Sequence, residues 1–301
     1  MEEKLSVQGI IINNASKLYI VEDIDTNELY KCNARGKFKE QKVILSVGDY
    51  VEYSIIDKEK GDGIIDNVCQ RKCYIKRPKI ANLTQIILVV SMKHPKPDML
   101  MLDKQLAFAE FNNIKPIICL NKIDLGDEAS INEFEEIYKP IGYQVIKTSA
   151  NEKIGIEELR NILKGNVTAF SGNSGVGKST IINCIFDYEI TKEGLISEKN
   201  HRGKNTTTST YLYKLDKDTY LADTPGFSTF DISEIESKDL YKYFVEFNVP
   251  AKGCEFIGCT HIKEENCGVK DAISRGVISQ SRYDRFCKIY TELKEKEAHR
   301  W

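Results

Sequence analysis

The sequence lacks the features that direct a chain into or across a membrane. Residues 1–6 (MEEKLS) do not show the basic and then apolar pattern of a signal peptide, and no apolar run approaches membrane-spanning length. No internal repeat or low-complexity segment is present in the 301 residues. These absences predict a cytoplasmic protein without a membrane partner.

An excess of either charge is also missing. The 43 Lys and Arg residues nearly balance the 45 Asp and Glu residues, and the formal net charge is −2. Nucleic-acid binding would therefore have to come from local basic patches and not from a high overall charge. The content of 41% hydrophobic and 29% charged residues is typical of a globular protein, and the length suggests two or three domains.

What the chain does contain is a phosphate-binding loop. Residues 172–179 (GNSGVGKS) match the pattern G-x-x-x-x-G-K-[ST], with an apolar strand-like stretch before them and a helix-like stretch after them. Lys178 is expected to reach the β- and γ-phosphates and Ser179 to bind Mg²⁺. The predicted phosphate-binding set is Gly172, Asn173, Ser174, Gly175, Val176, Gly177, Lys178, Ser179 and Thr180.

A second motif, NKID at residues 121–124, indicates which base is bound. Asp124 can accept hydrogen bonds from guanine N1–H and the exocyclic amino group, two donors that adenine does not present in that arrangement. The apolar run 115–120 predicts a buried strand, so Asn121 stands at its carboxyl end, where open α/β sheets bind ligands. Asn121 would hold the loop and the base edge, and Lys122 would lie along the base plane. By itself the motif also fits a surface loop, but beside a phosphate loop it favours guanine.

Further segments complete a GTPase set. Ser149 and Ala150 follow a strand-like run, and their backbone is expected near guanine O6. Asp223 ends another apolar run and is expected to hold the water shell of Mg²⁺, with Gly226 contacting the γ-phosphate. The polar stretch 198–210 resembles a switch loop, and its Thr207 is expected to complete the Mg²⁺ shell. Either neighbouring threonine, Thr206 or Thr208, is an alternative ligand, and a solvated strand edge is an alternative interpretation of the run.

The order of these motifs is unusual. The guanine motif and Ser149 come before the phosphate loop, whereas a GTPase domain ordinarily opens with that loop. A site at the carboxyl ends of parallel strands depends on where strands end in space and not on chain order. The sequence therefore predicts a circularly permuted GTPase domain.

Cysteine is clustered near the C-terminus. Nine cysteines, in a chain without an export signal, fit reduced thiols and a metal site better than a disulfide framework. Residues 254–267 contain C-x₄-C-x-H-x₅-C, and three thiolates with one imidazole can close a tetrahedral structural zinc site. The alternative is that these cysteines are only small buried residues. The predicted ligands of this single zinc ion are Cys254, Cys259, His261 and Cys267.

The two ends of the chain define the remaining domains. Short alternating segments between residues 7 and 68, separated by turn residues, predict a small β-barrel of the oligonucleotide-binding (OB) type. Within it, residues 31–39 (KCNARGKFK) are a candidate loop for RNA contact, and a solvated charged loop is an equal alternative. A basic linker, 71–79, follows. Helices are expected after residue 230, including an apolar stripe over 280–290. The predicted domains are 1–70, 71–230 and 231–301.

Together these motifs resemble the ribosome small subunit-dependent GTPase A (RsgA) family. The resemblance extends to residues 77–82 (RPKIAN), 272–273 (AI) and 282–283 (RY) and covers nearly the whole chain. It implies an α/β fold in which a permuted P-loop GTPase domain lies between an OB barrel and a helical zinc-binding domain. It also implies hydrolysis of GTP, with Mg²⁺, stimulated by the small ribosomal subunit during late maturation of that subunit. The barrel would contact ribosomal RNA, and we expect a monomer.

One departure from the family concerns the attacking water. Many members carry His before the paired threonines, where this chain has Asn205, and Phe227 stands where Ras-like enzymes have Gln. The catalytic set is therefore limited to Lys178, Thr207 and Gly226, and a slow intrinsic rate is expected. Two alternatives remain at this point: a nucleotide-gated RNA-binding module with weak hydrolysis, and a permuted GTPase that acts on the large subunit.

Overall fold

The computed structural model describes residues 7–15, 18–186, 210–223 and 231–299. The chain divides into two compact units. The first combines Met1–Gln85, Leu159–Phe170 and Asn183–Phe227, and the second combines Ile86–Glu158, Ser171–Ile182 and Ser228–Trp301. Each unit is therefore assembled from segments that are far apart in the sequence.

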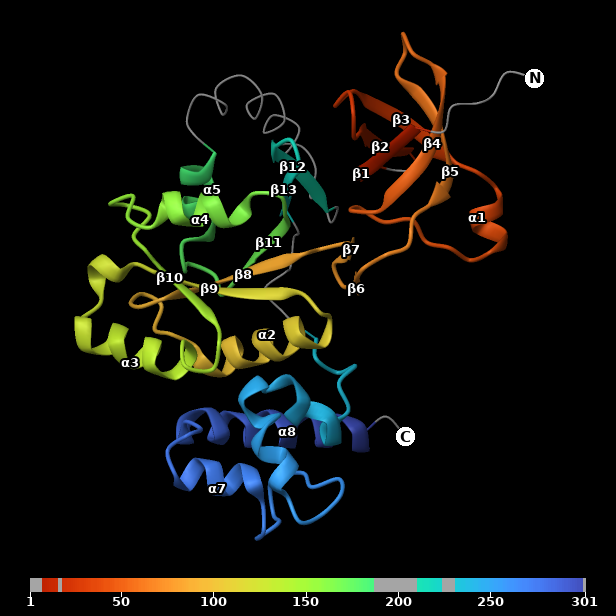
Figure 1. Ribbon diagram of the computed structural model, residues 1–301. Coiled ribbons are helices and arrows are strands. Elements are labelled where there is room, and N and C mark those ends of the chain that lie inside the picture. The colour runs from red at the N-terminus through yellow and green to blue at the C-terminus, as the bar shows by residue number, and fades with distance from the viewer. Residues whose placement is uncertain (1–6, 16–17, 187–209, 224–230, 300–301) are drawn as a thin grey trace. The chain divides into compact units, whose positions relative to one another are not determined.

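Five strands of the first unit close into a barrel (Figure 1). They follow the order β1-β2-β3-β5-β4, and β1 also pairs with β4, which completes the closure. Only β3 and β5 are parallel; the other neighbours are antiparallel. The strands are β1 (Val7–Ala15), β2 (Leu18–Asp23), β3 (Leu29–Ala34), β4 (Tyr50–Asp57) and β5 (Asp62–Val68). This confirms the predicted OB-like barrel.

The barrel interior follows from alternation along the strands, because successive side chains point to opposite faces. Ile10, Val21 and Tyr53 are completely buried. The Tyr53 hydroxyl donates a hydrogen bond to Asp23 Oδ2 at 2.6 Å, which satisfies a polar group inside an apolar core.

Residues 31–39, the candidate loop for RNA contact, do not form a loop. Residues up to Ala34 belong to β3, and α1 (Lys37–Glu40) follows after a short turn. Phe38, the aromatic residue expected to stack on a base, is only 5% exposed. Burial removes the apolar ring from water and stabilises the fold, so the ring is not available to stack on a base. Lys31, Arg35 and Lys39 are exposed.

The basic linker is ordered. It forms the hairpin of β6 (Tyr74–Lys76) and β7 (Lys79–Ala81). Arg71 donates from Nε to Asp49 Oδ1 at 2.6 Å and lies over the ring of Tyr74 at 4.3 Å. The Arg71 guanidinium is therefore engaged by Asp49 and Tyr74 of the same chain.

A second group of strands in the first unit joins the barrel. β11 (Val167–Ser171) runs parallel to β13 (Thr219–Asp223), which pairs antiparallel with β12 (Tyr211–Asp216). β12 in turn pairs with β1 of the barrel. The carboxylate of Glu22, which is 5% exposed, accepts a hydrogen bond from the Tyr220 hydroxyl at 2.7 Å and pairs with Lys214. This buried contact fixes the β12–β13 hairpin to the barrel.

The second unit contains three strands in the order β10-β9-β8. They are β8 (Gln85–Ser91), β9 (Lys115–Asn121) and β10 (Gln144–Thr148), and β9 and β10 are parallel. Every residue of β8 is buried, which is typical of a sheet covered on both faces. Helices α2 (Met99–Phe111) and α3 (Glu128–Tyr138) pack on one face of these strands (Figure 1).

Two helices connect segments of the two units in the chain. They are α4 (Ile156–Leu163) and α5 (Lys178–Ile185), and α5 begins directly after the phosphate loop. The predicted strand-loop-helix order around that loop is therefore present, from β11 through residues 172–177 to α5.

The C-terminal part of the second unit is helical, as expected. Its first three helices are of the 3-10 type: η2 (Ser237–Tyr243), η3 (Val245–Phe247) and η4 (Pro250–Gly253). They are followed by α7 (Gly268–Ser274) and α8 (Gln280–Ala298). The apolar stripe of α8 packs inward: the ring of Phe286 lies 5.2 Å from Phe244 and 4.8 Å from Phe247.

Candidate functional site

Asn121 links three of the predicted nucleotide-binding segments. It is the last residue of β9 and is 1% exposed. Its Nδ2 donates to the carbonyl oxygen of Val176 at 2.9 Å, and its Oδ1 accepts from Thr148 Oγ1 at 3.0 Å. The side-chain amide therefore uses a donor and its acceptor to hold the phosphate loop and the end of β10 against the guanine motif.

Lys122 reaches the same loop from a left-handed backbone conformation, with φ of 61°. Its Nζ donates to the carbonyl oxygen of Gly175 at 2.8 Å and also to that of His94. Asp124 lies in the short 3-10 helix η1 (Ile123–Leu125), and its side chain is exposed. The lysine thus joins the loops that surround the site, while the aspartate is accessible to a ligand.

Ser149 is fixed at the other wall of the site. Its N–H donates to Ile154 O at 3.1 Å, and Ile154 N–H donates back to Ser149 O at 3.0 Å. Ser149 is fully buried and Ala150 is 9% exposed. Because the N–H of Ser149 is already used in this turn, any contact of the segment with a base has to involve other backbone groups.

Two glycines of the phosphate loop cannot be replaced without moving their neighbours. A Cβ on Gly172, where φ is +142°, would lie 2.3 Å from Val89 O. A Cβ on Gly177, where φ is +101°, would lie 2.3 Å from Asn121 Nδ2. Both distances are far below van der Waals contact, so the loop closes onto β8 and Asn121 only because side chains are absent here.

The backbone of the loop is arranged to receive an anion. The N–H groups of residues 174–177 have no acceptor within the described part of the chain, and α5 begins immediately after them. Unpaired N–H groups at a helix start attract phosphate. Lys178 Nζ donates to Gly172 O at 2.6 Å and Asn173 O at 2.9 Å, and burial lowers the pKa of its amine. Ser179 and Thr180 are exposed at the first turn.

The other predicted catalytic and Mg²⁺-binding residues are described only in part. Asp223 is the last residue of β13, as the sequence predicted, and belongs to the first unit. Thr207 and Gly226 lie outside the described residues, as do Asn205, Thr206, Thr208 and Phe227. The structure therefore brings together the guanine and phosphate motifs of the second unit, and the roles of the remaining residues stay predictions.

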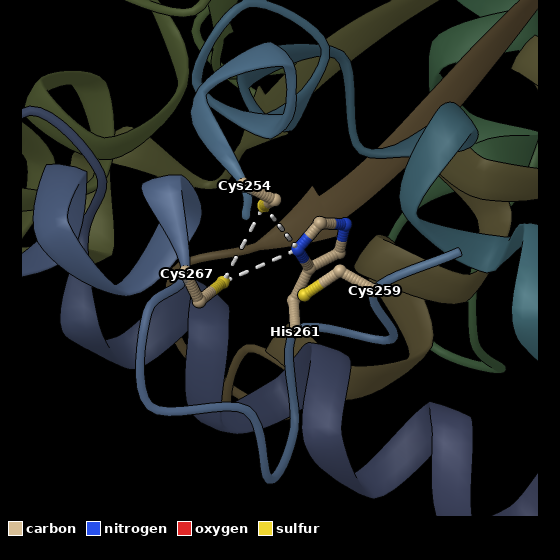
Figure 2. A group of neighbouring side chains, drawn as sticks. All are labelled: Cys254, Cys259, His261 and Cys267. Carbon is tan, nitrogen blue, oxygen red and sulfur yellow. Dashed lines mark hydrogen bonds between the residues drawn. The ribbon is translucent and has the colours of Figure 1, made fainter. Parts of the chain in front are cut away.

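The four predicted metal ligands converge on one point (Figure 2). Their ligand atoms all lie within 4.8 Å of one another. Cys254 Sγ is 3.8 Å from Cys267 Sγ, and His261 Nδ1 is 3.3 Å from Cys267 Sγ and 3.5 Å from Cys254 Sγ. A tetrahedral zinc ion with ordinary bond lengths requires about 3.8 Å between sulfurs and about 3.6 Å between sulfur and nitrogen. Cys259 completes the set.

The chemistry of this cluster also fits a cation. Burial raises the pKa of the Cys259 thiol to about 12 and lowers the pKa of the His261 imidazole. Neutral imidazole is the form that binds metals, and thiols this deeply buried lose their protons only when a positive charge replaces them. His261 is 1% exposed and its Nδ1, not its Nε2, faces the sulfurs. The donor set is therefore suited to a structural metal ion.

Sequence reasoning missed Glu264, which organises the turn between the ligands. Its carboxylate accepts from Thr260 N at 3.0 Å, Thr260 Oγ1 at 2.9 Å, and Ile262 N and Lys263 N at 3.1 Å. Burial alone would raise the pKa of Glu264, but the hydrogen bonds from Thr260 and Lys263 outweigh burial and lower it to about 2. The only feature of the sequence that could have indicated this role is a Glu inside the C-x-H-x₅-C loop.

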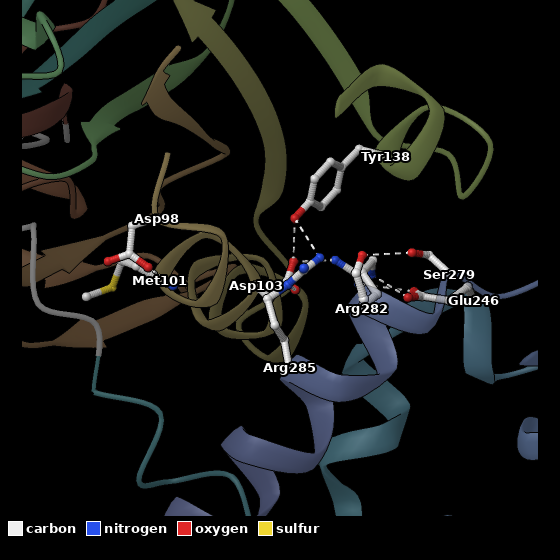
Figure 3. Close-up of polar contacts among 9 residues, drawn as sticks. Asp98, Met101, Asp103, Tyr138, Glu246, Ser279, Arg282 and Arg285 are labelled. Atoms are coloured by element: carbon white, nitrogen blue, oxygen red, sulfur yellow. Dashed lines mark hydrogen bonds and ion pairs between the residues drawn. The ribbon is translucent and has the colours of Figure 1, made fainter. Parts of the chain in front are cut away.

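Sequence reasoning also missed a buried charge network at Arg282, which is 1% exposed (Figure 3). Arg282 Nη1 donates to Asp103 Oδ1 at 2.6 Å, and Nη2 donates to Glu246 Oε2 at 3.1 Å. Arg285 binds the other oxygen of Asp103, and the Tyr138 hydroxyl donates to Oδ1 at 2.8 Å. Helices α2, α3, η3 and α8 therefore meet at one satisfied cluster.

Helix α2 connects this network to the phosphate loop. Gln105 Nε2 donates to Ser171 Oγ at 3.2 Å inside the protein, and Asp98, the N-cap of α2, accepts from Asn173 Nδ2 at 3.3 Å. Asp103 lies between Asp98 and Gln105 in the sequence, but its side chain pairs with Arg282 of α8 and not with the residues around the phosphate loop. Since residues two apart on a helix point to different sides, α2 contacts the loop on one side and α8 on another.

Comparisons with known proteins agree with this geometry. A model of the RsgA GTPase matches residues 68–233, and one of the RsgA N-terminal domain matches residues 8–65. A protein of Thermotoga petrophila named "Small ribosomal subunit biogenesis GTPase RsgA" is 43% identical over 289 residues, which cover 95% of this chain and 96% of that protein.

Two solved structures have the same fold. The crystal structure of YjeQ from Thermotoga maritima is 40% identical, covers 96% of this chain and 99% of its own, and gives a TM-score of 0.85. YloQ, described as a circularly permuted GTPase, is 32% identical, covers 98% of both chains and gives a TM-score of 0.82. The fold and the motifs thus define a circularly permuted GTPase. The chain belongs to the RsgA GTPase family, as the sequence predicted.

Among the described residues, no helix is both long enough and apolar enough to cross a membrane.

Proposed function

We propose that the protein is a GTPase that binds the small ribosomal subunit and hydrolyses GTP to GDP and phosphate during late maturation of that subunit. The observation that carries the nucleotide assignment is the bond between Asn121 Nδ2 and Val176 O, because it joins the guanine motif to the phosphate loop despite their reversed order. The nearly full-length similarity to proteins named for small-subunit biogenesis supports the partner.

In this proposal the base is read at the carboxyl end of β9. Asp124, exposed in η1, accepts hydrogen bonds from guanine N1–H and the amino group, and the Lys122 stem lies along the base. Asn121 keeps its position because Thr148 and Val176 occupy its amide. The backbone at Ala150 lies on the side of guanine O6. Adenine would cover the Asp124 carboxylate without offering it these donors, and a carboxylate that loses its water without gaining a partner is costly.

The phosphates are bound by the loop that follows β11. The N–H groups of residues 174–177, which have no acceptor among the described residues, surround the β-phosphate in this proposal. Lys178 then exchanges the carbonyl oxygens of Gly172 and Asn173 for phosphate oxygens. Ser179, Thr207 and Asp223 are the proposed protein contacts of Mg²⁺ and its water shell. Mg²⁺ would offset charge on the transferred phosphoryl group, which is where P-loop GTPases gain most of their rate.

Catalysis is proposed to depend on the partner. Lys178, Thr207 and Gly226 are the proposed catalytic residues, and neither Asn205 nor Phe227 can remove a proton from water at neutral pH. The small subunit is therefore proposed to order the attacking water. The same two residues favour one second candidate, an RNA-binding module that is controlled by nucleotide and hydrolyses GTP only weakly.

The remaining assignments concern the domains around the GTPase core. We propose zinc as the metal of Cys254, Cys259, His261 and Cys267, with a structural role, since four protein ligands leave no open position. The barrel is proposed to contact ribosomal RNA, and the protein to act as a cytoplasmic monomer. The three domains 1–70, 71–230 and 231–301 also remain a proposal.

A multiple-turnover GTPase assay with and without purified small subunits tests this function. We expect subunits to raise kcat clearly, and the Lys178→Ala variant to lose activity in both conditions. An exposed lysine of the second unit, Lys139, provides the matched control as Lys139→Ala. A rate that does not respond to small subunits, together with tight binding to them, would support the weakly hydrolysing module instead.

A further inference from the structure

A groove of about 1190 Å³ runs along the C-terminal part of the second unit, away from the nucleotide motifs. It lies between η4, the loop that carries Cys267, and α7, with the turn at Pro140 and Ile141 also contributing to its lining. We call it the α7 groove. None of the residues that line it belongs to the guanine or phosphate motifs, so the GTPase reaction does not explain it.

The α7 groove is lined in part by apolar side chains that are exposed to solvent. Val249 is 76% exposed and Val277 is 63% exposed, and both line the groove. Two further exposed apolar side chains, Phe256 and Ile257, lie between these valines in the sequence but do not line the groove. A single exposed apolar residue is ordinary, whereas two that line the same groove give it an apolar surface for a partner to cover.

The rim of the groove is acidic. Glu255 and Glu265 are exposed and have no cationic partner among the described residues; Glu255 only accepts a hydrogen bond from Asn266. The lining holds two cations and four carboxylates, which are Glu246, Glu255, Glu265 and Asp271. Asp271 pairs with Arg275 at 3.0 Å and Glu246 pairs with Arg282, so these two carboxylates are compensated. Lys270 donates to the carbonyl oxygen of Glu264 at 3.0 Å and keeps its charge, so the two remaining carboxylates and this one cation leave an excess of one negative charge.

Cys267, one of the proposed metal ligands, also forms part of the groove wall. With a divalent ion bound, three thiolates and the ion would together carry one negative charge, which would add to the potential of the rim. A phosphate backbone brought to this rim would meet uncompensated carboxylates, and like charges in contact oppose association. A cationic side chain would be attracted at the same place.

We propose that the α7 groove binds a basic segment of a small-subunit protein and not RNA. In this complex a Lys or Arg side chain lies at Glu255 and Glu265, and a neighbouring apolar side chain packs between Val249 and Val277. The assignment rests on the proposed function, which brings the chain to a particle made of RNA and protein. Of these two components only a basic protein segment matches both the carboxylate rim and the apolar walls.

Charge reversal at the rim gives a test in which the two partner classes predict opposite signs. The variant Glu255→Lys/Glu265→Lys makes the protein more positive, which strengthens binding to any polyanion. If the groove holds a basic segment, the same variant should bind small subunits about 5- to 30-fold more weakly, since rim attractions are replaced by repulsion. Unchanged or tighter binding would overturn the proposal.

The matched control is Glu133→Lys/Glu136→Lys, which makes the same charge change at exposed positions of α3. We expect this control to bind subunits as tightly as the unchanged protein or more tightly. The single variant Glu265→Lys serves as a second test, because it leaves the bond between Asn266 and Glu255 in place. Metal content and melting temperature of each variant show whether the cluster remains folded.

A photo-cross-linking residue in place of Val277 identifies the occupant. The full chain, loaded with a non-hydrolysable GTP analogue, is irradiated with purified small subunits, and the product is analysed for protein and for RNA. We expect a cross-link to a basic protein segment. A cross-link to ribosomal RNA, or none despite normal co-sedimentation, overturns this proposal alone, whereas loss of co-sedimentation of the unchanged protein overturns the proposed function together with it.

Discussion

The metal cluster and the nucleotide site belong to the same unit but are built in opposite ways. The proposed metal ligands all come from one segment, Cys254 to Cys267, with little regular structure between them. The nucleotide site depends on distant contacts, such as the bond of Asn121 to Val176, 55 residues further along the chain. One site is local in sequence and the other exists only after the sheet has formed.

They also differ in what holds them together. The nucleotide site is stabilised by the protein itself, because carbonyl oxygens of the loop accept bonds from Asn121, Lys122 and Lys178. The cluster instead includes two thiols, Cys259 and Cys267, whose pKa burial raises, to about 12 for Cys259. A local site such as the metal cluster can therefore depend on its ligand for folding, whereas a non-local site such as the nucleotide site has to be folded before its ligand binds.

Metal removal should produce the largest effect. Chelation, or Cys267→Ser, should unfold the segment around the cluster, since structural zinc contributes about 10 kcal/mol or more of coupled folding energy in small domains. Metal analysis of protein purified without added zinc should give one ion per chain. Proteolysis within 254–267 after chelation would report the unfolding.

Nucleotide removal is the matched experiment, and it should leave the second unit folded. GTP titration should also remain close to normal after chelation, once the chelator has been removed and Mg²⁺ restored, because the four proposed metal ligands, Cys254, Cys259, His261 and Cys267, lie outside the guanine and phosphate motifs. An intact C-terminal segment in protein with a metal content near zero would show that the cluster does not depend on a metal ion for its folding.

The next largest effect should come from Arg282, which joins the two regions through α2 and α8. Arg282→Met leaves Asp103 and Glu246 buried with fewer partners, and breaking such a pair costs about 3 to 5 kcal/mol of unfolding free energy. Denaturant unfolding measures the loss.

Arg275 provides the control for this change. It pairs with Asp271 at the surface, where both side chains are 63% exposed, so Arg275→Met should cost no more than about 1 kcal/mol. Equal losses in the two variants would show that burial of the network does not matter.

A smaller and more selective effect is expected at the base. Asp124→Asn should weaken GTP binding by about 2 kcal/mol or more, because an amide donor then faces a donor of guanine. Metal content should not change, which separates the two sites. Glu128→Gln, at an exposed carboxyl group nearby, is the control, and wild-type GTP affinity in Asp124→Asn would rule out the assigned pocket.

The smallest effect should appear when a support of Asn121 is removed. Thr148→Val abolishes the bond to Asn121 Oδ1 and leaves a buried acceptor without its partner, which costs about 1 to 2 kcal/mol. Isothermal titration with GDP would detect it as weaker binding. Thr148→Ser keeps the hydroxyl and should bind nearly as the unchanged protein does; a deficit equal to that of valine would point to packing and not to the hydrogen bond.

Several parts of this molecule could be predicted because their signals are local. Three cysteines and one histidine in one short segment predict a cluster, and their ligand atoms do lie together. The glycines at 172 and 177 before Lys178 predict a tight loop, and both have positive φ. The barrel was predictable from alternating strands. Its residues 31–39 were not, because a short helix buries Phe38 while the lysines around it produce the pattern of an exposed loop.

The family and the permuted order of the motifs followed from the sequence alone, and so did the proposed guanine-, phosphate- and metal-binding residues, since each rests on residue type at fixed spacing. Only the tertiary structure showed that Arg282 meets Asp103, 179 residues away, and that acidic and apolar residues line one groove beside α7. Spacing cannot encode such contacts, because they depend on how helices pack and on which charges lose their water when they do.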